Sequence, residues 1–183
     1  TRVLTQERVD GVKITDIATL DAPGLDREQL AINFFRALLQ QVLIDGFFHA
    51  DPHPGNVWVN PATGRIIFLD MGLMGYLALE DRFALGELIW ALQDHDAQSV
   101  TRVLVAICMP SRGYNPKALE RDIERLVNRS LLFEEFPASL TSMMKDLIDV
   151  LLRHGLQVRK EFTLAIKAIG QGESIMRTLL GDQ

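Results

Sequence analysis

A loop that cannot be helical interrupts a chain otherwise patterned for helices. Over residues 27–45, apolar side chains recur every three to four positions, and Gly46 follows where a left-handed helix cap is expected. The helical period then stops, because Pro52, Pro54 and Gly55 do not fit the interior of a helix. The sequence therefore predicts a long helix followed by a stiff loop.

A β-hairpin is expected directly after this loop. Two short apolar runs, residues 57–59 and 66–69, flank the turn-forming residues 60–64. The opening residues 3–9 carry β-branched side chains and stop at the turn 10–11, so they predict a further strand, although its partner is not evident. Strand structure is thus confined to the first part of the chain.

The remainder of the chain is patterned for helices. The predicted helices cover residues 79–94, 97–109, 116–133, 138–154 and 160–180. Asn115 and Pro116 form a cap and first-turn pair, and Gly155 is a stop signal. With 183 residues, the length fits one domain, so we expect a mainly α fold into which the loop and hairpin are set.

Composition excludes several classes of protein. The formal net charge of −5 excludes a generally basic surface, so we expect no nucleic acid partner. The single cysteine, Cys108, is expected to be a buried core thiol, and neither a disulfide framework nor a cysteine zinc site can be built. No apolar run approaches the roughly 18 residues of a membrane span, and residues 1–3 do not begin a signal peptide, so a cytoplasmic location is expected.

The segment between Gly46 and Asn56 gathers polar side chains of the kinds that enzymes use. His49, Asp51, His53 and Asn56 fall within eight residues. The two intervening prolines fix the backbone, so the loop loses little entropy on folding and can hold polar groups in set positions. The same residue types also form ordinary turns, which is the alternative explanation.

Asp70 ends the second apolar run, and a hairpin returns the chain close to its start. Asp70 is therefore expected near Asn56, fourteen positions earlier. An amide carbonyl and a carboxylate, with water and phosphate oxygens, suit a hard cation such as Mg²⁺. Asp51 stands five residues before Asn56 and within reach of the same space.

The histidines also have structural explanations. His49 is expected to brace the loop through backbone hydrogen bonds, in preference to proton transfer. The spacing of His49, Asp51 and His53 is compatible with zinc or iron, but the prolines constrain the geometry and no third strong ligand is apparent. His95 and His154, near predicted helix ends, are expected to interact with helix dipoles or solvent.

The order His-x-Asp-x-x-x-x-Asn, hairpin, Asp-x-Gly resembles the catalytic loop and metal loop of the protein-kinase fold. Residues 46–56 and 68–72 resemble the UbiB family of atypical kinase-like proteins, relatives of bacterial and organellar quinone-biosynthesis factors. The opening residues 3–7 resemble the hinge strand of that family. The resemblance extends more weakly over the whole chain.

This resemblance implies roles for five residues. Asp51 would be the catalytic Asp, and His49, in the same loop, would be a second catalytic residue. Asn56 and Asp70 would bind Mg²⁺ and, together with Glu7 of the hinge-like segment, the ATP. His53 matches the loop of the family but has no implied role.

The resemblance also implies an organisation for the chain. Residues 1–183 would be a single domain, the C-terminal lobe of a kinase-like fold, with a hinge strand remnant at 1–12, catalytic and metal loops at 46–75 and helices over 79–183. The nucleotide loop, lysine and glutamate of an N-terminal lobe are not found in this chain, so we expect it to be inactive alone. Met71 stands where the family usually has Phe.

The expected function is that of an atypical kinase or ATPase in isoprenoid-quinone or lipid metabolism. Two alternatives stay open: a small-molecule phosphotransferase of the aminoglycoside or choline kinase type, and a catalytically silent kinase-like scaffold. Expected partners are the N-terminal kinase lobe, a membrane lipid or isoprenoid-quinone precursor at the membrane periphery, and a second copy bound through exposed apolar surface.

Overall fold

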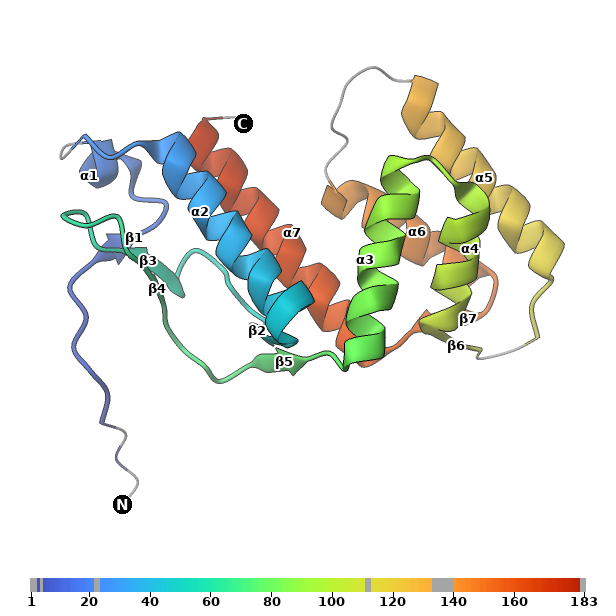
Figure 1. Cartoon of the computed structure of the whole chain (residues 1–183), viewed down its shortest axis with the longest axis horizontal. Helices are drawn as coiled ribbons and strands as arrows, with labels where there is room; N and C mark the ends of the chain where they lie inside the picture. The colour runs from blue at the N-terminus through green and yellow to red at the C-terminus, as the bar shows by residue number, and fades with distance from the viewer. Residues whose placement is uncertain (1–2, 4, 22–23, 111–112, 133–139, 182–183) are drawn as a thin grey trace.

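The computed structural model describes residue 3 and residues 5–21, 24–110, 113–132 and 140–181 (Figure 1). The helices are α1 (Ile17–Asp21), α2 (Arg27–Leu39), α3 (Leu79–Gln93), α4 (Ala97–Ala106), α5 (Pro116–Leu132), α6 (Leu140–Arg153) and α7 (Lys160–Leu180), and a π-helical turn η1 spans Gln40–Asp45. The strands are β1 (Val12–Lys13), β2 (Phe47–His49), β3 (Val57–Val59), β4 (Ile66–Phe68), β5 (Met74–Tyr76), β6 (Cys108–Pro110) and β7 (Leu156–Val158). The prediction of a mainly α fold is confirmed.

Helices α2 and α7 lie side by side along their lengths, so the last helix of the chain packs against the first long one (Figure 1). From α3 onward each helix packs on the next, which brings α6 back against α7. The buried side chains form two clusters. The larger includes Phe48 and Phe162, and the smaller surrounds Phe34 where α2 and α7 meet the β3–β4 hairpin.

The predicted hairpin is present, with β3 and β4 antiparallel and Val57 opposite Phe68. Its turn is held by the side chain of Asn60, whose Oδ1 accepts hydrogen bonds from the backbone N–H groups of Ala62 (3.0 Å) and Thr63 (3.1 Å). Gly64 has φ +69°, a left-handed conformation that glycine adopts without steric cost. The turn chemistry recognised in the sequence is therefore the chemistry that closes the hairpin.

The opening strand is placed wrongly by the sequence pattern. Among the described residues before Val12, none is in a strand, and β1 instead covers Val12–Lys13, with Val12 opposite Val59. Residues 1, 2 and 4 of the expected hinge strand lie outside the described residues. A strand requires a partner edge. The hairpin offers its β3 edge to Val12 and Lys13, so pairing begins after Asp10 and Gly11 rather than before them.

The long predicted helices are present, with one correction at residues 107–109. Helix α4 ends at Ala106, and Cys108–Pro110 form strand β6, which pairs with β7. Pro110 cannot continue a helix and disfavours helical conformation at Met109. The last residue of the helix expected at 116–133 and the first two residues of the helix expected at 138–154 lie outside the described residues. The Asn115 cap is confirmed, since its Oδ1 accepts from Ala118 N–H at 3.2 Å.

Cys108 is only half-buried, which corrects the expectation of a fully buried thiol. The burial it does have raises the pKa of its thiol to about 11, so the thiol stays protonated at neutral pH. Within the described chain, no helix combines the length and the apolar character needed to cross a membrane.

Candidate active site

The polar loop is held at both ends by short strands. Strand β2 pairs with β5, which places His49 opposite Met74, and β3 begins immediately after Asn56. Gly46 caps the preceding η1 turn with φ +69° and turns the chain sharply into β2. The loop therefore connects two paired strands, and its polar groups are fixed relative to them.

His49 is buried, with 1% of its surface exposed, and both of its ring nitrogens are engaged. Nε2 lies 2.8 Å from the carbonyl oxygen of Leu69, and Nδ1 accepts a hydrogen bond from the backbone N–H of Asp51 at 3.1 Å. A carbonyl only accepts and an N–H only donates, so this pattern requires the neutral tautomer protonated at Nε2. His49 thus braces the loop, as its structural explanation predicted, and its expected part in catalysis stays a prediction.

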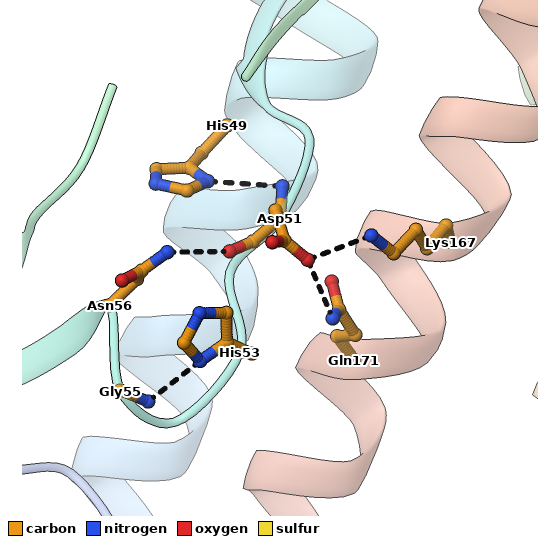
Figure 2. Close-up of polar contacts among 7 residues, drawn as sticks. All are labelled: His49, Asp51, His53, Gly55, Asn56, Lys167 and Gln171. Atoms are coloured by element: carbon orange, nitrogen blue, oxygen red, sulfur yellow. Dashed lines mark hydrogen bonds and ion pairs between the residues drawn. The ribbon is translucent and has the colours of Figure 1, made fainter. Parts of the chain in front are cut away.

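Asp51 is held by two side chains of α7 (Figure 2). Its Oδ1 accepts hydrogen bonds from Lys167 Nζ at 2.8 Å and from Gln171 Nε2 at 2.9 Å. These two hydrogen bonds, that of Lys167 first, hold the pKa of the Asp51 carboxyl below its usual range. The side chain remains 31% exposed. Asp51 is consequently an ionised carboxylate with a fixed orientation and access to solvent.

Lys167 and Gln171 are functional candidates that the sequence analysis missed. They lie 116 and 120 residues after Asp51, in a helix whose pattern shows only an ordinary amphipathic face. Their spacing of four residues, one turn of helix, could have singled them out only once the partner of α7 was known.

The hairpin brings Asn56 and Asp70 to the same end, as expected. The backbone N–H of Leu69, next to Asp70, donates to the carbonyl oxygen of Asn56 at 2.8 Å. Asn56 Nδ2 donates to the carbonyl oxygen of Asp51 at 3.3 Å, which leaves its side-chain oxygen for another partner (Figure 2). Asp70 is exposed, and its Oδ1 accepts from Gly72 N–H at 3.1 Å.

Asp70 also has an unusual backbone conformation, with φ +54°. Left-handed conformations are uncommon for residues other than glycine and cluster at functional sites, although Asp tolerates them better than most. The conformation places Asp70 at the tight turn that follows β4. Its exposed carboxylate and the amide oxygen of Asn56 are the oxygen ligands that a hard divalent cation prefers.

The chain itself does not build a closed metal cage here. Within the described ranges, no three His, Cys, Asp or Glu side chains are grouped closely enough to hold a metal ion. The zinc or iron alternative at His49, Asp51 and His53 therefore has no support in the geometry. The Nδ1 atom of His53 instead accepts from Gly55 N–H at 3.0 Å, within the loop (Figure 2). The residues fit a cation that takes its remaining ligands from water and phosphate.

Glu7 is not brought to this site. It is exposed in the N-terminal segment, which extends away from the helices in Figure 1. Among the described residues, no hydrogen bond or ion pair joins Glu7 to the loop. Its expected nucleotide contact therefore stays a prediction.

Sequence comparison assigns the family. The profile of the ABC1 atypical kinase-like domain matches residues 1–104, which include the loop, the hairpin and the Asp70 turn. The chain belongs to the ABC1 atypical kinase-like family. The expected resemblance is confirmed, and the fold is a mainly α kinase-like lobe. Lys167 and Gln171 lie beyond the matched residues.

Curated relatives of this ABC1 chain match it almost from end to end. An uncharacterized protein of Synechocystis sp. is 32% identical over 181 residues, which are 98% of this chain and 31% of that protein. A probable protein kinase UbiB of Xanthomonas oryzae pv. oryzae and one of Xylella fastidiosa are each 34% identical over 188 residues, covering 97% of this chain and 33% of each relative. The chain thus spans about a third of the length of these relatives.

The matched domain is described as atypical kinase-like, and two of the relatives are named probable protein kinases. In protein kinases, a catalytic-loop Asp and Asn precede a second Asp that holds the metal. Asp51, Asn56 and Asp70 have this order here and lie along one loop and hairpin.

Proposed function

We propose that this chain supplies the catalytic and metal-binding loops of an atypical kinase or ATPase that binds Mg-ATP. The observation that carries the proposal is that hydrogen bonds link Asn56 to Asp51 and to Leu69, the residue before Asp70, at one end of the β3–β4 hairpin. The loop is fixed by prolines and by the buried His49, so its polar groups are preorganised. Phosphoryl transfer depends mainly on such positioning and on charge neutralisation.

Asn56 and Asp70 would hold Mg²⁺ through the Asn56 amide oxygen and the Asp70 carboxylate. When bound, the metal ion neutralises charge on the phosphate oxygens. Asp51 orients the attacking hydroxyl or water and accepts its proton. We assign the roles in this way because the Asp70 carboxylate is exposed and can reach a metal ion. The Asp51 carboxylate is instead fixed by a hydrogen bond from Lys167 of α7.

A hollow beside the hairpin supports nucleotide binding. It has a volume of about 450 Å³, is open to solvent, and is lined by Gly11, Val12, Lys13, Thr15, Asp16 and Trp58. Trp58 Nε1 donates to the carbonyl oxygen of Gly55 at 3.1 Å, so its indole is anchored to the end of the catalytic loop. We assign this hollow to the nucleoside part of ATP.

The phosphoryl acceptor is proposed to belong to isoprenoid-quinone or lipid metabolism. This assignment is supported by the UbiB name of two relatives and by the sequence resemblance to quinone-biosynthesis factors. An acceptor of this chemistry would be met at a membrane periphery.

The proposal is tested by measuring Mg-ATP binding to the full-length protein by calorimetry. Asp70→Asn should weaken Mg²⁺-dependent affinity about tenfold or more, because the substitution removes the anionic metal ligand. Asp94→Asn, an exposed residue at the end of α3, is the control and should bind as wild type does. Unchanged affinity and metal dependence in Asp70→Asn would remove Asp70 from the metal site.

A further inference from the structure

One oxygen of Asp51 is fully occupied by the last helix of the chain. Lys167 and Gln171 project from successive turns of α7 and donate to the same atom, Oδ1, at 2.8 and 2.9 Å (Figure 2). Oδ2 receives no hydrogen bond from any residue that the structure describes. The two oxygens of one carboxylate therefore have different environments, one engaged by the protein and one available to a ligand.

The loop fixes Asp51 from the opposite side. The Asp51 backbone N–H donates to His49 Nδ1, and its carbonyl oxygen accepts from Asn56 Nδ2. Backbone and side chain are thus both restrained, and the carboxylate has little freedom to rotate. Such restraint on a reacting group is what positioning in catalysis requires.

The side chain of Gln171 contacts Asp51 at the cost of an unsatisfied hydrogen-bond acceptor. Its Oε1 is buried and has no hydrogen-bond partner within the described part of the chain, while its Nε2 is committed to Asp51. A buried acceptor without a donor is unfavourable, and such groups call for an explanation beyond stability. Orientation of Asp51 is an explanation that the geometry supplies.

We propose that Lys167 and Gln171 are positioning residues for Asp51, which they hold through Oδ1 so that Oδ2 faces the attacking hydroxyl or water. The inference rests on the proposed function. In the step itself, the attacking oxygen forms a bond to the γ-phosphorus, the bond from that phosphorus to the ADP oxygen breaks, and the proton of the attacking group passes to Oδ2. Lys167 and Gln171 contact Asp51 and act through it.

The full-length protein, assayed for Mg-ATP turnover, tests this role. Lys167→Met and Gln171→Leu should each lower kcat about tenfold or more and leave KM for ATP unchanged, because the nucleotide is held elsewhere. Lys167→Arg keeps a charged donor and should retain more activity than Lys167→Met. The control is Lys160→Met, an exposed lysine at the start of the same helix, which should match wild type. Circular dichroism establishes that each variant is folded.

A double-variant cycle separates action through Asp51 from direct contact with phosphate. In an Asp51→Asn background, Lys167→Met should cause no further loss of kcat, because the group that it positions is already neutral. A further multiplicative loss, or a rise in KM, would overturn the positioning role. Turnover that requires Asp51 but is unaffected by Lys167→Met and Gln171→Leu would overturn this inference alone. A folded wild-type protein without turnover would overturn the proposed function and the inference together.

Discussion

The imidazole Nε2 of His49 lies 2.8 Å from the carbonyl oxygen of Leu69, twenty residues further along the chain. This contact joins the polar loop to the turn that carries Asp70, because Asp70 follows Leu69 directly. The opposite ring nitrogen reaches the backbone N–H of Asp51. One buried side chain therefore couples the positions of the two carboxylates on which the proposed chemistry depends.

We predict that His49→Phe destabilises the protein. Phe keeps the ring volume but leaves the Leu69 carbonyl and the Asp51 N–H without their partners, at a cost of about 1–3 kcal/mol for each buried group. His53→Phe is the comparison, since His53 is half-buried and loses one contact within the loop. Thermal melts of the two variants should show the larger fall for His49→Phe. A melt of His49→Phe that superimposes on that of wild type would show that the hydrogen bonds of His49 to Leu69 and Asp51 do not contribute to stability.

Two glycine-to-alanine substitutions should have opposite effects on stability. A Cβ at Gly75, opposite Phe48 in the β2–β5 pair, would overlap the fully buried Phe48 ring. We expect Gly75→Ala to cost about 1–3 kcal/mol through overpacking. A Cβ at Gly86, inside α3, would meet nothing within 4 Å.

Gly86→Ala should therefore stabilise the protein by about 0.5–1 kcal/mol, because alanine is the better helix former. Denaturant titration of both variants provides the measurement. Stabilisation by Gly75→Ala would contradict the tight packing between β5 and Phe48. Gly75→Ala should also lower activity, because a displaced Phe48 would shift His49, the next residue in the chain.

Acid stability should depend on the contact between Asp122 of α5 and His154 at the end of α6. Asp122 Oδ2 lies 2.9 Å from His154 Nε2, and this hydrogen bond is the main cause that holds the pKa of the Asp122 carboxyl below its usual range. A folded-state pKa below the unfolded value, which is about 3.9 for Asp, gives stability that is present above the unfolded pKa and is lost as the pH falls through the folded pKa.

Asp122→Asn should remove this contribution, so the stability of the variant should fall less steeply than that of wild type as the pH falls below about 4. Asp149→Asn, an exposed position on α6, provides the matched control. Parallel curves of stability against pH for wild type and Asp122→Asn would show that the Asp122–His154 contact does not make stability depend on pH.

Nucleotide binding should change the fluorescence of Trp58. The chain has two tryptophans, and Trp90 is 68% exposed on α3 while Trp58 lines the proposed nucleoside hollow. A Trp90→Phe variant of the full-length protein reports Trp58 as the only tryptophan contributed by these 183 residues. Mg-ATP should alter the emission of this variant, and the same change should be absent after a further Trp58→Phe. An unchanged spectrum at saturating Mg-ATP would place the nucleoside elsewhere.

The parts of the fold that local chemistry decides could be predicted from sequence. Helix periodicity, the Gly46 cap and the Asn60 turn act within a few residues, so they located α2 and the hairpin and, through the hairpin, the proximity of Asn56 and Asp70. Pairing between strands that are far apart in the sequence has no such local signal. The helical pattern of residues 97–109 runs on over the residues of β6, because the partner strand, β7, lies almost fifty residues later.

The same limit applied to the site. The loop identified Asp51 as a candidate, but its partner Lys167 is 116 residues away in sequence. Only the packing of α7 beside the loop brings the two side chains together. A lysine and a glutamine one turn apart on an amphipathic helix are indistinguishable from solvated surface until that packing is known.

The most direct test of the account is to compare chemistry and binding in Asp51→Asn. In the full-length protein, Mg-ATP affinity measured by calorimetry should stay within about twofold of wild type, since Asp51 is not proposed as a metal ligand. The rate of phosphoryl transfer or ATP hydrolysis should fall by about 10² to 10⁴, the range that a positioned base contributes. Turnover at the wild-type rate in a folded Asp51→Asn protein would contradict the account and leave Asp51 as a structural residue of the loop.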